Sequence, residues 1–262
     1  ARGAATSVIT DPSFDFAGAD PGLQVLVLDA ETRHLAPEQA YAIVRLAVER
    51  ALAANVGCIY KKTDSALRGN IGAELTAAMD AAGTPKLPFI PAFPKINRTT
   101  KDGVHLIGGV PVAESVFGQD PYEPVRHSRV ADILGEQTSL AVIHRLPGRA
   151  DGDMPGIQVF DAVSDDDLMK IGRQLGLSGT RLCAGCAGFA AVMANLLNLT
   201  GPPPRIPFLK KPFFIACGSV NPVTRYQLDF AEQAGFSRFQ LLPEEKLLPA
   251  WLESGDCAAK VQ

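Results

Sequence analysis

Short apolar runs alternate with longer stretches of helical periodicity along most of the chain. The short runs, rich in Val, Ile, Leu and Phe, are TSVITD, QVLVLDAE, CIYKKT, KLPFIPAFP, LAVIHRL, GIQVFDAV and TRLCAG. Buried strands that alternate with amphipathic helices are typical of right-handed βαβ units on a parallel sheet. We therefore predict an α/β fold with a mainly parallel sheet flanked by helices.

The longer stretches place their apolar residues on one face of a helix. In PEQAYAIVRLAVERALAAN, the apolar stripe at the 3.6-residue period consists of Ile43, Val44, Ala47, Val48, Ala51 and Leu52. The other helical stretches are GNIGAELTAAMDAAG, SDDDLMKIGRQLG and GFAAVMANLLNL. Ser164 is a favourable N-cap, and the carboxylates of Asp165 to Asp167 suit the positive end of a helix dipole. We assign these carboxylates to capping and not to a metal site.

Two stretches depart from the βαβ pattern. GVHLIGGVPVAES predicts two short strands joined at Gly108-Gly109, which is an antiparallel hairpin insertion. TGPPPRIPFLKKP, residues 200–212, predicts a stiff linker because three successive prolines cannot continue a helix. With a boundary near Pro207, residues 1–207 form the first domain, and residues 208–262 begin a second α/β domain with strands in PFFIACGS and FSRFQLL. This part is too short for a whole domain, and ARGAAT reads as the tail of a preceding helix, so we expect both ends to be incomplete.

Composition narrows the class of protein. Lys and Arg number 25 against 28 Asp and Glu, for a net charge of −3, so no basic field attracts nucleic acid or an anionic membrane. The five cysteines lie mostly in apolar runs without a regular framework, which favours reduced thiols and a cytoplasmic location. No run of about 18 apolar residues and no signal-peptide pattern occurs. We therefore expect neither a nucleic-acid nor a membrane partner.

Polar residues gather where one predicted strand gives way to the next helix, in YKKTDSALRGNIGAEL. The polar side chains of this stretch are Lys61, Lys62, Thr63, Asp64, Ser65 and Arg68. Open α/β folds bind ligands at the carboxyl edge of the sheet, where backbone N–H groups near Gly69 and Asn70 would add the positive end of a helix. The cluster therefore predicts an anion-binding site. A capped turn with surface ion pairs is the alternative.

Two further stretches place polar residues after strands. LDAETRH contributes Asp29 and Arg33 to what we expect to be the same edge of the same sheet, although these two residues could also form a structural pair. FPKINRTTKDGVHLIGG contributes Arg98 and His105. For His105, packing in the interior and contact with a ligand are both open.

A glycine-rich turn in CGSVNPVT indicates a second anion site. Gly218 and Ser219 would let backbone N–H groups approach a phosphate, and a helix beginning near Pro222 would add its dipole. The stretch is neither a P-loop nor a dinucleotide fingerprint, so the signal is weak alone. CAGCAGFA has one Cys pair and no nearby His, which disfavours zinc, and we assign no metal-ligating residue.

Taken together, several stretches resemble the four-carbon acid sugar kinase family over nearly the whole chain. They are LDAETRHLAPEQAY, KKTDSALRGNIGAEL, PAFPKINRTTKDGVHLIGGVPVAES, DPYEPV, CAGCAGFAAVMA and CGSVNPVTRYQ. The K-K-T-D-S-x-L-R-G and R-T-T-x-x-G-V-H blocks are the specific ones. The resemblance implies an ATP- and Mg²⁺-dependent kinase that phosphorylates the terminal 4-hydroxyl of threonate, erythronate or 3-oxo-tetronate. Some relatives carry a type III effector label.

The resemblance also implies roles for individual residues. Its substrate contacts are similar to Arg33, Lys61, Lys62, Thr63 and Asp64, and its ATP contact is similar to Ser219 beside Gly218. The family's D-D-x-T-G motif would precede Ala1, and its Gly-rich nucleotide motif would follow Gln262. Cys186 stands where many relatives have Ser or Thr, which puts a hydroxyl contact there in doubt.

A mechanism follows from the chemistry of a sugar acid. We predict that Arg33, Lys61 and Lys62 hold the substrate and that one of the two ammonium groups then faces the transferring phosphoryl group, with Lys62 assigned as catalytic. Asp64 is predicted to orient or deprotonate the acceptor hydroxyl. A carboxylate of the D-D-x-T-G motif is an equal candidate for that last role. The full set predicted to contact substrate is Asp29, Arg33, Lys61, Lys62, Thr63, Asp64, Ser65, Arg68, Arg98 and His105.

Two other functions remain as alternatives. Lys61 and Lys62 could form a Schiff-base pair of an aldolase, because one ammonium beside another lowers a pKa. The chain could also bind a sugar acid without catalysis, as a binding or effector protein. The hairpin insertion is a candidate contact surface for a homodimer.

Overall fold

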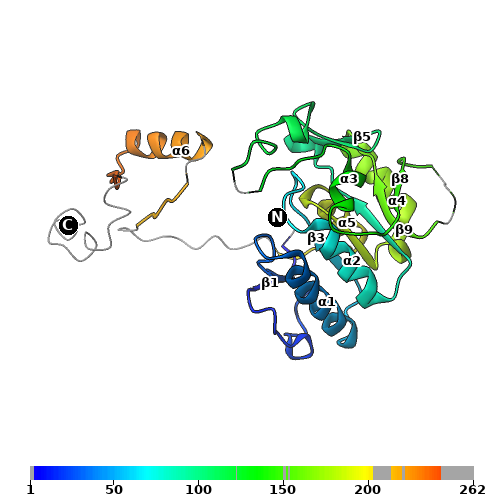
Figure 1. Ribbon diagram of the computed structural model, residues 1–262. Helices are drawn as coiled ribbons and strands as arrows, with labels where there is room; N and C mark the ends of the chain where they lie inside the picture. The colour runs from blue at the N-terminus through cyan, green and yellow to red at the C-terminus, as the bar shows by residue number, and fades with distance from the viewer. Residues whose placement is uncertain are drawn as a thin grey trace. The chain divides into compact units, whose positions relative to one another are not determined.

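The chain divides into two units, Ala1–Arg205 and Ile206–Gln262. The computed structural model describes residues 3–121, 123–149, 152, 154–202, 214–219 and 222–242 (Figure 1). Most of the predicted linker at residues 200–212, including Pro207, lies outside the described residues. The two predicted domains therefore stay a prediction.

A five-stranded parallel sheet forms the centre of the first unit. In spatial order its strands are β3 (Ile59–Lys62), β10 (Leu182–Gly185), β4 (Lys86–Ile90), β9 (Gly156–Phe160) and β8 (Val142–Arg145). All five were predicted from their short apolar runs. The prediction of a mainly parallel α/β fold is confirmed.

Helices cover both faces of this sheet and enclose two apolar cores. On one face lie α1 (Pro37–Ala53), α2 (Ile71–Ala82) and α3 (Val130–Gly135), whose core includes the fully buried Leu75 and Phe89 (Figure 1). On the other face lie α4 (Asp165–Gly179) and α5 (Ala187–Leu196), around Ile171 and Phe189. Ser164 caps α4 as predicted, because its hydroxyl accepts a hydrogen bond from the backbone N–H of Asp167 at 3.2 Å.

The predicted hairpin insertion is confirmed and has one more strand than expected. β6 (Val104–Ile107) and β7 (Val110–Pro111) are antiparallel and meet at Gly108 and Gly109, which both have positive φ. β5 (Arg98–Lys101) pairs with β6 on the other side and completes a three-stranded sheet. Short 3-10 helices occupy Phe16–Gly18, Pro94–Ile96 and Val112–Glu114.

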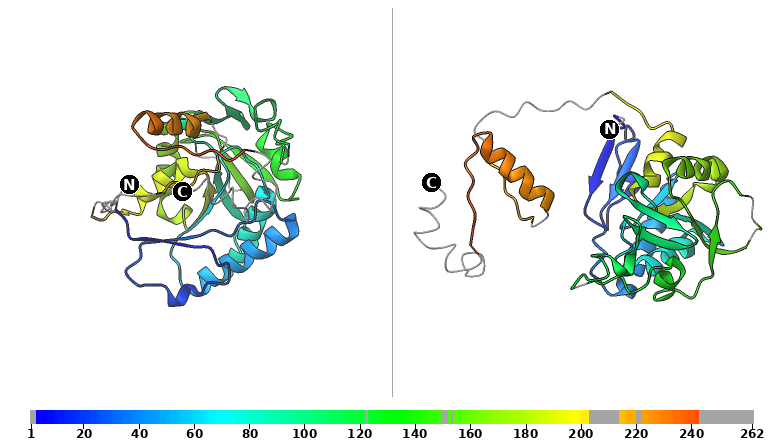
Figure 2. Two further views of the ribbon diagram at one scale, coloured as in Figure 1. Left: turned by 90° about the vertical axis from the view of Figure 1, so that its left-hand side faces the viewer. Right: turned by 90° about the horizontal axis from the view of Figure 1, so that it is seen from above.

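The first two strands stand apart from the main sheet. β1 (Thr6–Ile9) and β2 (Val25–Leu28) pair in parallel as a separate sheet, side by side in blue in the right-hand view of Figure 2. The expectation that the strand of LDAETRH shares one sheet with β3 is therefore wrong. Within the described residues, the hydrogen-bonded neighbour of β3 is β10, and an apolar run does not specify its pairing partner.

The described part of the second unit contains one helix, α6 (Pro222–Gln233). Its predicted flanking strands are wrong over the described residues, because 214–219 and 236–242 form no β-ladder. A strand exists only when a neighbour accepts and donates its backbone hydrogen bonds, and an apolar run alone does not supply one. None of the described helices is both long enough and apolar enough to cross a membrane.

Candidate functional site

Lys61 and Lys62 end β3 and face opposite sides of the sheet, because successive strand residues alternate. The ammonium of Lys61 lies 2.6 Å from Oε2 of the buried Glu74 on α2. Glu74 also accepts a hydrogen bond from the hydroxyl of Thr32. Lys62 is exposed, and among the described residues its ammonium has no ion pair. Of the two lysines, Lys62 is the one open to a ligand.

Asp64 holds two arginines at the carboxyl edge of the sheet. Its Oδ2 lies 2.9 Å from Nε of Arg68, and its Oδ1 accepts from Nη2 of Arg68 at 3.2 Å and from Nη2 of Arg33 at 3.3 Å. Burial alone would raise the pKa of the Asp64 carboxyl, but the hydrogen bonds and charge of Arg68, with a smaller effect of Arg33, hold it below its ordinary value. Asp64 is therefore an ionised anchor and a weak base.

The loop that carries Arg33 is fixed by the start of α2. The side-chain amide of Asn70 donates to the carbonyls of Thr32 at 2.9 Å and Leu35 at 2.8 Å. Gly69 adopts a φ of +87°, and a Cβ there would lie 3.0 Å from Cγ of Arg33. The positive φ and the lack of room for a Cβ both require a glycine at position 69. The close approach of Gly69 to Arg33 helps to place the Arg33 guanidinium beside Asp64.

His105 lies in the interior, fully buried. Its hydrogen bonds assign a neutral ring in which Nε2 donates to the carbonyl of Ser65 at 2.9 Å and Nδ1 accepts from the hydroxyl of Thr100 at 3.2 Å. Burial lowers the pKa of His105 to about 4. These contacts favour the packing alternative, in which His105 supports the Lys61–Arg68 turn, and a ligand contact by His105 stays an untested prediction.

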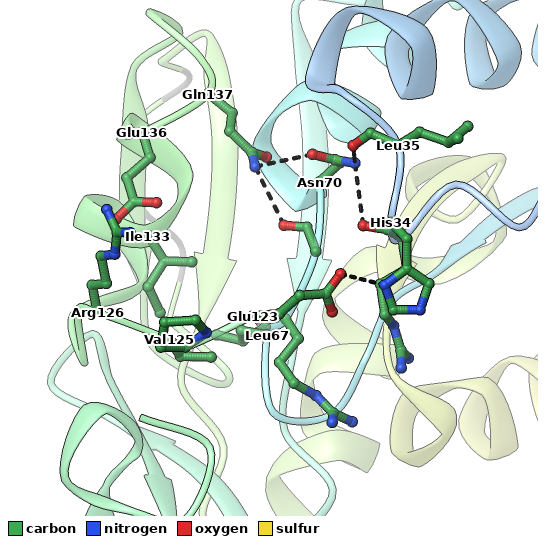
Figure 3. Close-up of a pocket in the computed structure, with 14 residues that line it drawn as sticks. His34, Leu35, Leu67, Asn70, Glu123, Val125, Arg126, Ile133, Glu136 and Gln137 are labelled. Atoms are coloured by element: carbon green, nitrogen blue, oxygen red, sulfur yellow. Dashed lines mark hydrogen bonds and ion pairs between the residues drawn. The ribbon is translucent and has the colours of Figure 1, made fainter. Parts of the chain in front are cut away.

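Arg33 and Arg68, which pair with Asp64, both line a cavity of about 340 Å³. Figure 3 shows the residues that line this cavity. Its lining residues come from four segments that are far apart in sequence: 33–35, 67–70, 123–126 and 133–137. Arg33 and Arg68 belong to the predicted site, whereas His34, Arg126 and Gln137 were not predicted. His34 Nδ1 lies 2.6 Å from Oε1 of Glu123 across the cavity. For the lining segment 123–126, the sequence signal was the motif DPYEPV, residues 120–125.

Several predicted residues do not line this cavity. Asp29 is exposed and accepts from the backbone N–H of Glu31 at 3.3 Å, as in a local turn. The hydroxyl of Thr63 is buried without a hydrogen-bond partner in the described structure. The thiol of Cys186 donates to the carbonyl of Ala92 at 3.2 Å and so faces the interior. Burial raises the pKa of this thiol.

Comparison with known proteins decides the family. Residues 1–193 match the family described as the sugar-binding N-terminal domain. The chain belongs to this family. It is 37% identical to D-threonate kinase of Bordetella bronchiseptica over 186 residues, which cover 68% of this chain and 46% of that protein. It is also 34% identical to D-threonate kinase of Salmonella typhimurium, with coverage of 79% and 51%.

D-erythronate kinase of Heliobacterium modesticaldum is 31% identical, with 87% of this chain and 54% of that protein covered. The chain therefore spans about half the length of these curated relatives. The resemblance to sugar acid kinases noted from the sequence motifs is confirmed at the level of these relatives.

Solved structures share the fold of this sugar-binding domain. A Bordetella bronchiseptica domain of unknown function, crystallised as a domain-swapped dimer with bound citrate, aligns with a TM-score of 0.65 and 28% identity over 97% of this chain and 66% of that chain. A Salmonella typhimurium protein named as a putative tRNA synthase aligns with a TM-score of 0.76 at 20% identity, over 98% of this chain and 65% of that one. The second likeness shows the fold alone.

The predicted ATP contacts lie in the second unit, outside the match to the sugar-binding domain family. Gly218 has open space around the position that a Cβ would take, and α6 begins shortly afterwards at Pro222. This arrangement fits a phosphate contact at a helix start, which stays a prediction. Among the described residues, no group of three or more His, Cys, Asp or Glu side chains is placed to hold a metal ion.

Proposed function

We propose that this protein is an ATP-dependent kinase that phosphorylates the terminal hydroxyl of a four-carbon sugar acid such as threonate, erythronate or 3-oxo-tetronate. The observation that carries the proposal is the cluster of Arg33, Asp64 and Arg68, in a chain of the sugar-binding N-terminal domain family. Two positions before Asp64 stands the exposed Lys62, whose ammonium has no ion pair within the part of the chain that the structure describes. The names of the curated relatives supply the reaction class.

The cluster suits a small acid with several hydroxyl groups. Guanidinium groups bind carboxylates through paired N–H donors, and Arg33 and Arg68 both border the cavity of about 340 Å³. This volume lies in the range of small-molecule pockets, roughly 300–1,000 Å³. The citrate held by the Bordetella structural relative, itself a hydroxy acid, supports an acid ligand of this class.

Phosphoryl transfer depends on positioning and charge neutralisation. In the proposed mechanism Lys62 meets the transferring phosphoryl group, since its ammonium is exposed at the end of β3. Gly218 and Ser219 would hold the phosphates of ATP, which would supply the phosphoryl group, and Mg²⁺ would supply neutralising charge. The lowered pKa of the Asp64 carboxyl favours a role in orienting the acceptor hydroxyl and the two arginines over a role as general base.

The aldolase alternative needs two ammonium groups side by side. The geometry of β3 disfavours it, because Lys61 pairs with Glu74 on the α2 face while Lys62 points to the other face. Borohydride treatment in the presence of a keto acid tests this alternative directly. A covalent adduct on Lys62 would revive it.

Assembly and location are parts of the same proposal. A homodimer is the proposed assembly, supported by the domain-swapped dimer reported for the Bordetella structural relative. The proposed location is the cytoplasm, since four described cysteines are free thiols. Light scattering of the purified protein tests the first point.

Consumption of ATP with a panel of D- and L-threonate, D- and L-erythronate and their 3-oxo forms tests the function. Turnover with one acid, lost in Lys62→Ala and reduced at least tenfold in Asp64→Asn, is the expected result. Binding of both ATP and an acid without turnover would instead favour the non-catalytic binding protein. Circular dichroism of both variants controls for folding.

A further inference from the structure

Arg98 has a buried donor without an acceptor in the described part of the chain. Its Nε makes no hydrogen bond there, and its Nη1 donates only weakly to the carbonyl of Ile96 at 3.4 Å. Among the described residues, no carboxylate pairs with Arg98. A buried guanidinium N–H without a partner is costly, so its retention calls for a reason.

The ring of Phe117 lies beside this guanidinium and beside a second one. The guanidinium carbon of Arg98 is 5.2 Å from the ring centroid, and that of Arg68 is 4.9 Å from it. Two cations repel each other, but the electron-rich face of an aromatic ring attracts both. Phe117 thus holds Arg68 of the predicted site next to Arg98 of β5.

Phe117 is itself fixed in place. Its backbone N–H donates to the hydroxyl of Ser115 at 3.2 Å, and its carbonyl accepts from the N–H of Val125 at 3.0 Å. Val125 is buried and lines the cavity that Arg33 and Arg68 border. Phe117 therefore contacts Arg98 of β5 through its ring and the cavity wall at Val125 through its backbone.

The two arginines beside the ring differ in their carboxylate partners. Arg68 faces the carboxylates of Asp64 and, at 3.7 Å, of Asp120. Arg98 has no ion pair among the described residues, so its guanidinium is the one that a ligand carboxylate would neutralise.

We propose that Phe117 is a positioning residue that holds Arg98 and Arg68 together as a subsite for the carboxylate of the sugar acid. This inference rests on the proposed function, because it takes the acid as the ligand. Arg98 gains the counter-ion that it lacks, and Phe117 acts through the two arginines without touching the reacting atoms.

The test compares an acid with a neutral polyol of the same carbon chain. Binding of D-threonate and of threitol is measured by NMR titration of the 262-residue chain and of Phe117→Leu, which keeps apolar volume and removes the ring. Phe14→Leu is the matched control, because the ring of Phe14 packs on Phe16 and on no cation of the described residues. Phe117→Tyr restores an aromatic face and serves as the rescue variant.

The expected result is a loss of about tenfold in D-threonate affinity for Phe117→Leu, with threitol binding unchanged and the affinity restored in Phe117→Tyr. An equal loss for both ligands would show a merely structural role and overturn the inference, as would no loss at all. The proposed function is judged separately, by whether the wild-type chain binds at least one acid of the tetronate panel more tightly than the matching neutral polyol. If it prefers none of these acids, both proposals fail.

Discussion

Lys61 and Lys62, at the end of β3, have different surroundings: Lys61 pairs with a buried carboxylate, whereas Lys62 is exposed. At the scale of single residues we therefore expect Lys61 to contribute to stability and Lys62 to ligand binding. We predict that Lys61→Met lowers the free energy of unfolding by about 3 kcal/mol, because the buried carboxylate of Glu74 then loses its partner. Lys62→Met should change that free energy by less than about 0.5 kcal/mol and weaken acid binding instead. Urea unfolding and ligand titration of both variants measure the two effects.

A double variant provides the control for this prediction. Lys61→Met combined with Glu74→Gln removes both charges, so it should recover most of the stability lost in Lys61→Met alone. If Lys61→Met were as stable as the wild type, the ion pair between Lys61 and Glu74, at 2.6 Å, would contribute nothing to the free energy of unfolding.

His105 should make stability depend on pH. Because burial lowers its pKa to about 4 in the folded protein, the unfolded chain binds a proton first as the pH falls below about 6.5. The His105 contribution to stability is therefore largest above pH 6.5 and declines towards pH 4, at most by about 1.4 kcal/mol per pH unit. The difference in unfolding free energy between wild type and His105→Gln should shrink over this window in urea titrations.

The titration of other groups is common to both proteins and cancels in that difference. A difference that stays constant from pH 7 to pH 4.5 would mean that His105 titrates alike in the folded and unfolded chain, against its full burial and its hydrogen bond to Ser65.

At the residue scale, contacts between residues close together in the sequence could be predicted from the sequence. Asp64 and Arg68 are four residues apart, and their pairing follows from the turn that they share. Arg126 and Gln137 line the same cavity from a distant part of the sequence, and the side-chain amide of Gln137 donates to Oδ1 of Asn70 at the start of α2, at 3.3 Å. No local pattern marks such residues, since the contact is created by tertiary packing.

The contact between α2 and α3 gives a prediction at the scale of elements. A Cβ on Gly72 would lie 2.5 Å from the carbonyl oxygen of Leu134, closer than any packed side chain tolerates. An exposed Gly→Ala change within a helix stabilises by about 1 kcal/mol, but Gly72→Ala should destabilise by about 1–3 kcal/mol because the helices must separate.

Gly135 offers a matched control on the neighbouring helix. Nothing lies within 4 Å of the Cβ that Gly135→Ala would add, so this change should leave stability unchanged or raise it slightly. Urea unfolding of both variants separates close helix contact from helix propensity. Equal effects of the two substitutions would contradict the packing argument.

Helices and strands could be predicted where burial requires a recognisable pattern of apolar residues. β9 is wholly buried and carries the apolar run that its position demands, whereas the strand RTTK of β5 has no apolar residue and exists because β6 pairs with it. Strand partners were the weaker part of the prediction. Over the described residues β2 pairs with β1 alone, because the hydrogen-bonded neighbours of a strand depend on the whole chain and not on the apolar run itself.

At the scale of the whole molecule, the residues proposed for the acid and those proposed for ATP lie in different units. Both apolar cores and the cavity belong to Ala1–Arg205, while Gly218 and Ser219 belong to Ile206–Gln262. We predict that a chain ending at Arg205 binds the sugar acid within about twofold of the affinity of the 262-residue chain and loses binding of ATP.

Calorimetric titration of both chains with the acid and with ATP measures this separation, and thermal unfolding confirms that the shorter chain is folded. The reason to expect retained acid binding is that Arg33, Asp64 and Arg68 take their partners from the first unit. Loss of acid binding by a folded shorter chain would mean that residues 206–262 contribute to the acid site. Retention of ATP binding would refute the assignment of ATP to Gly218 and Ser219.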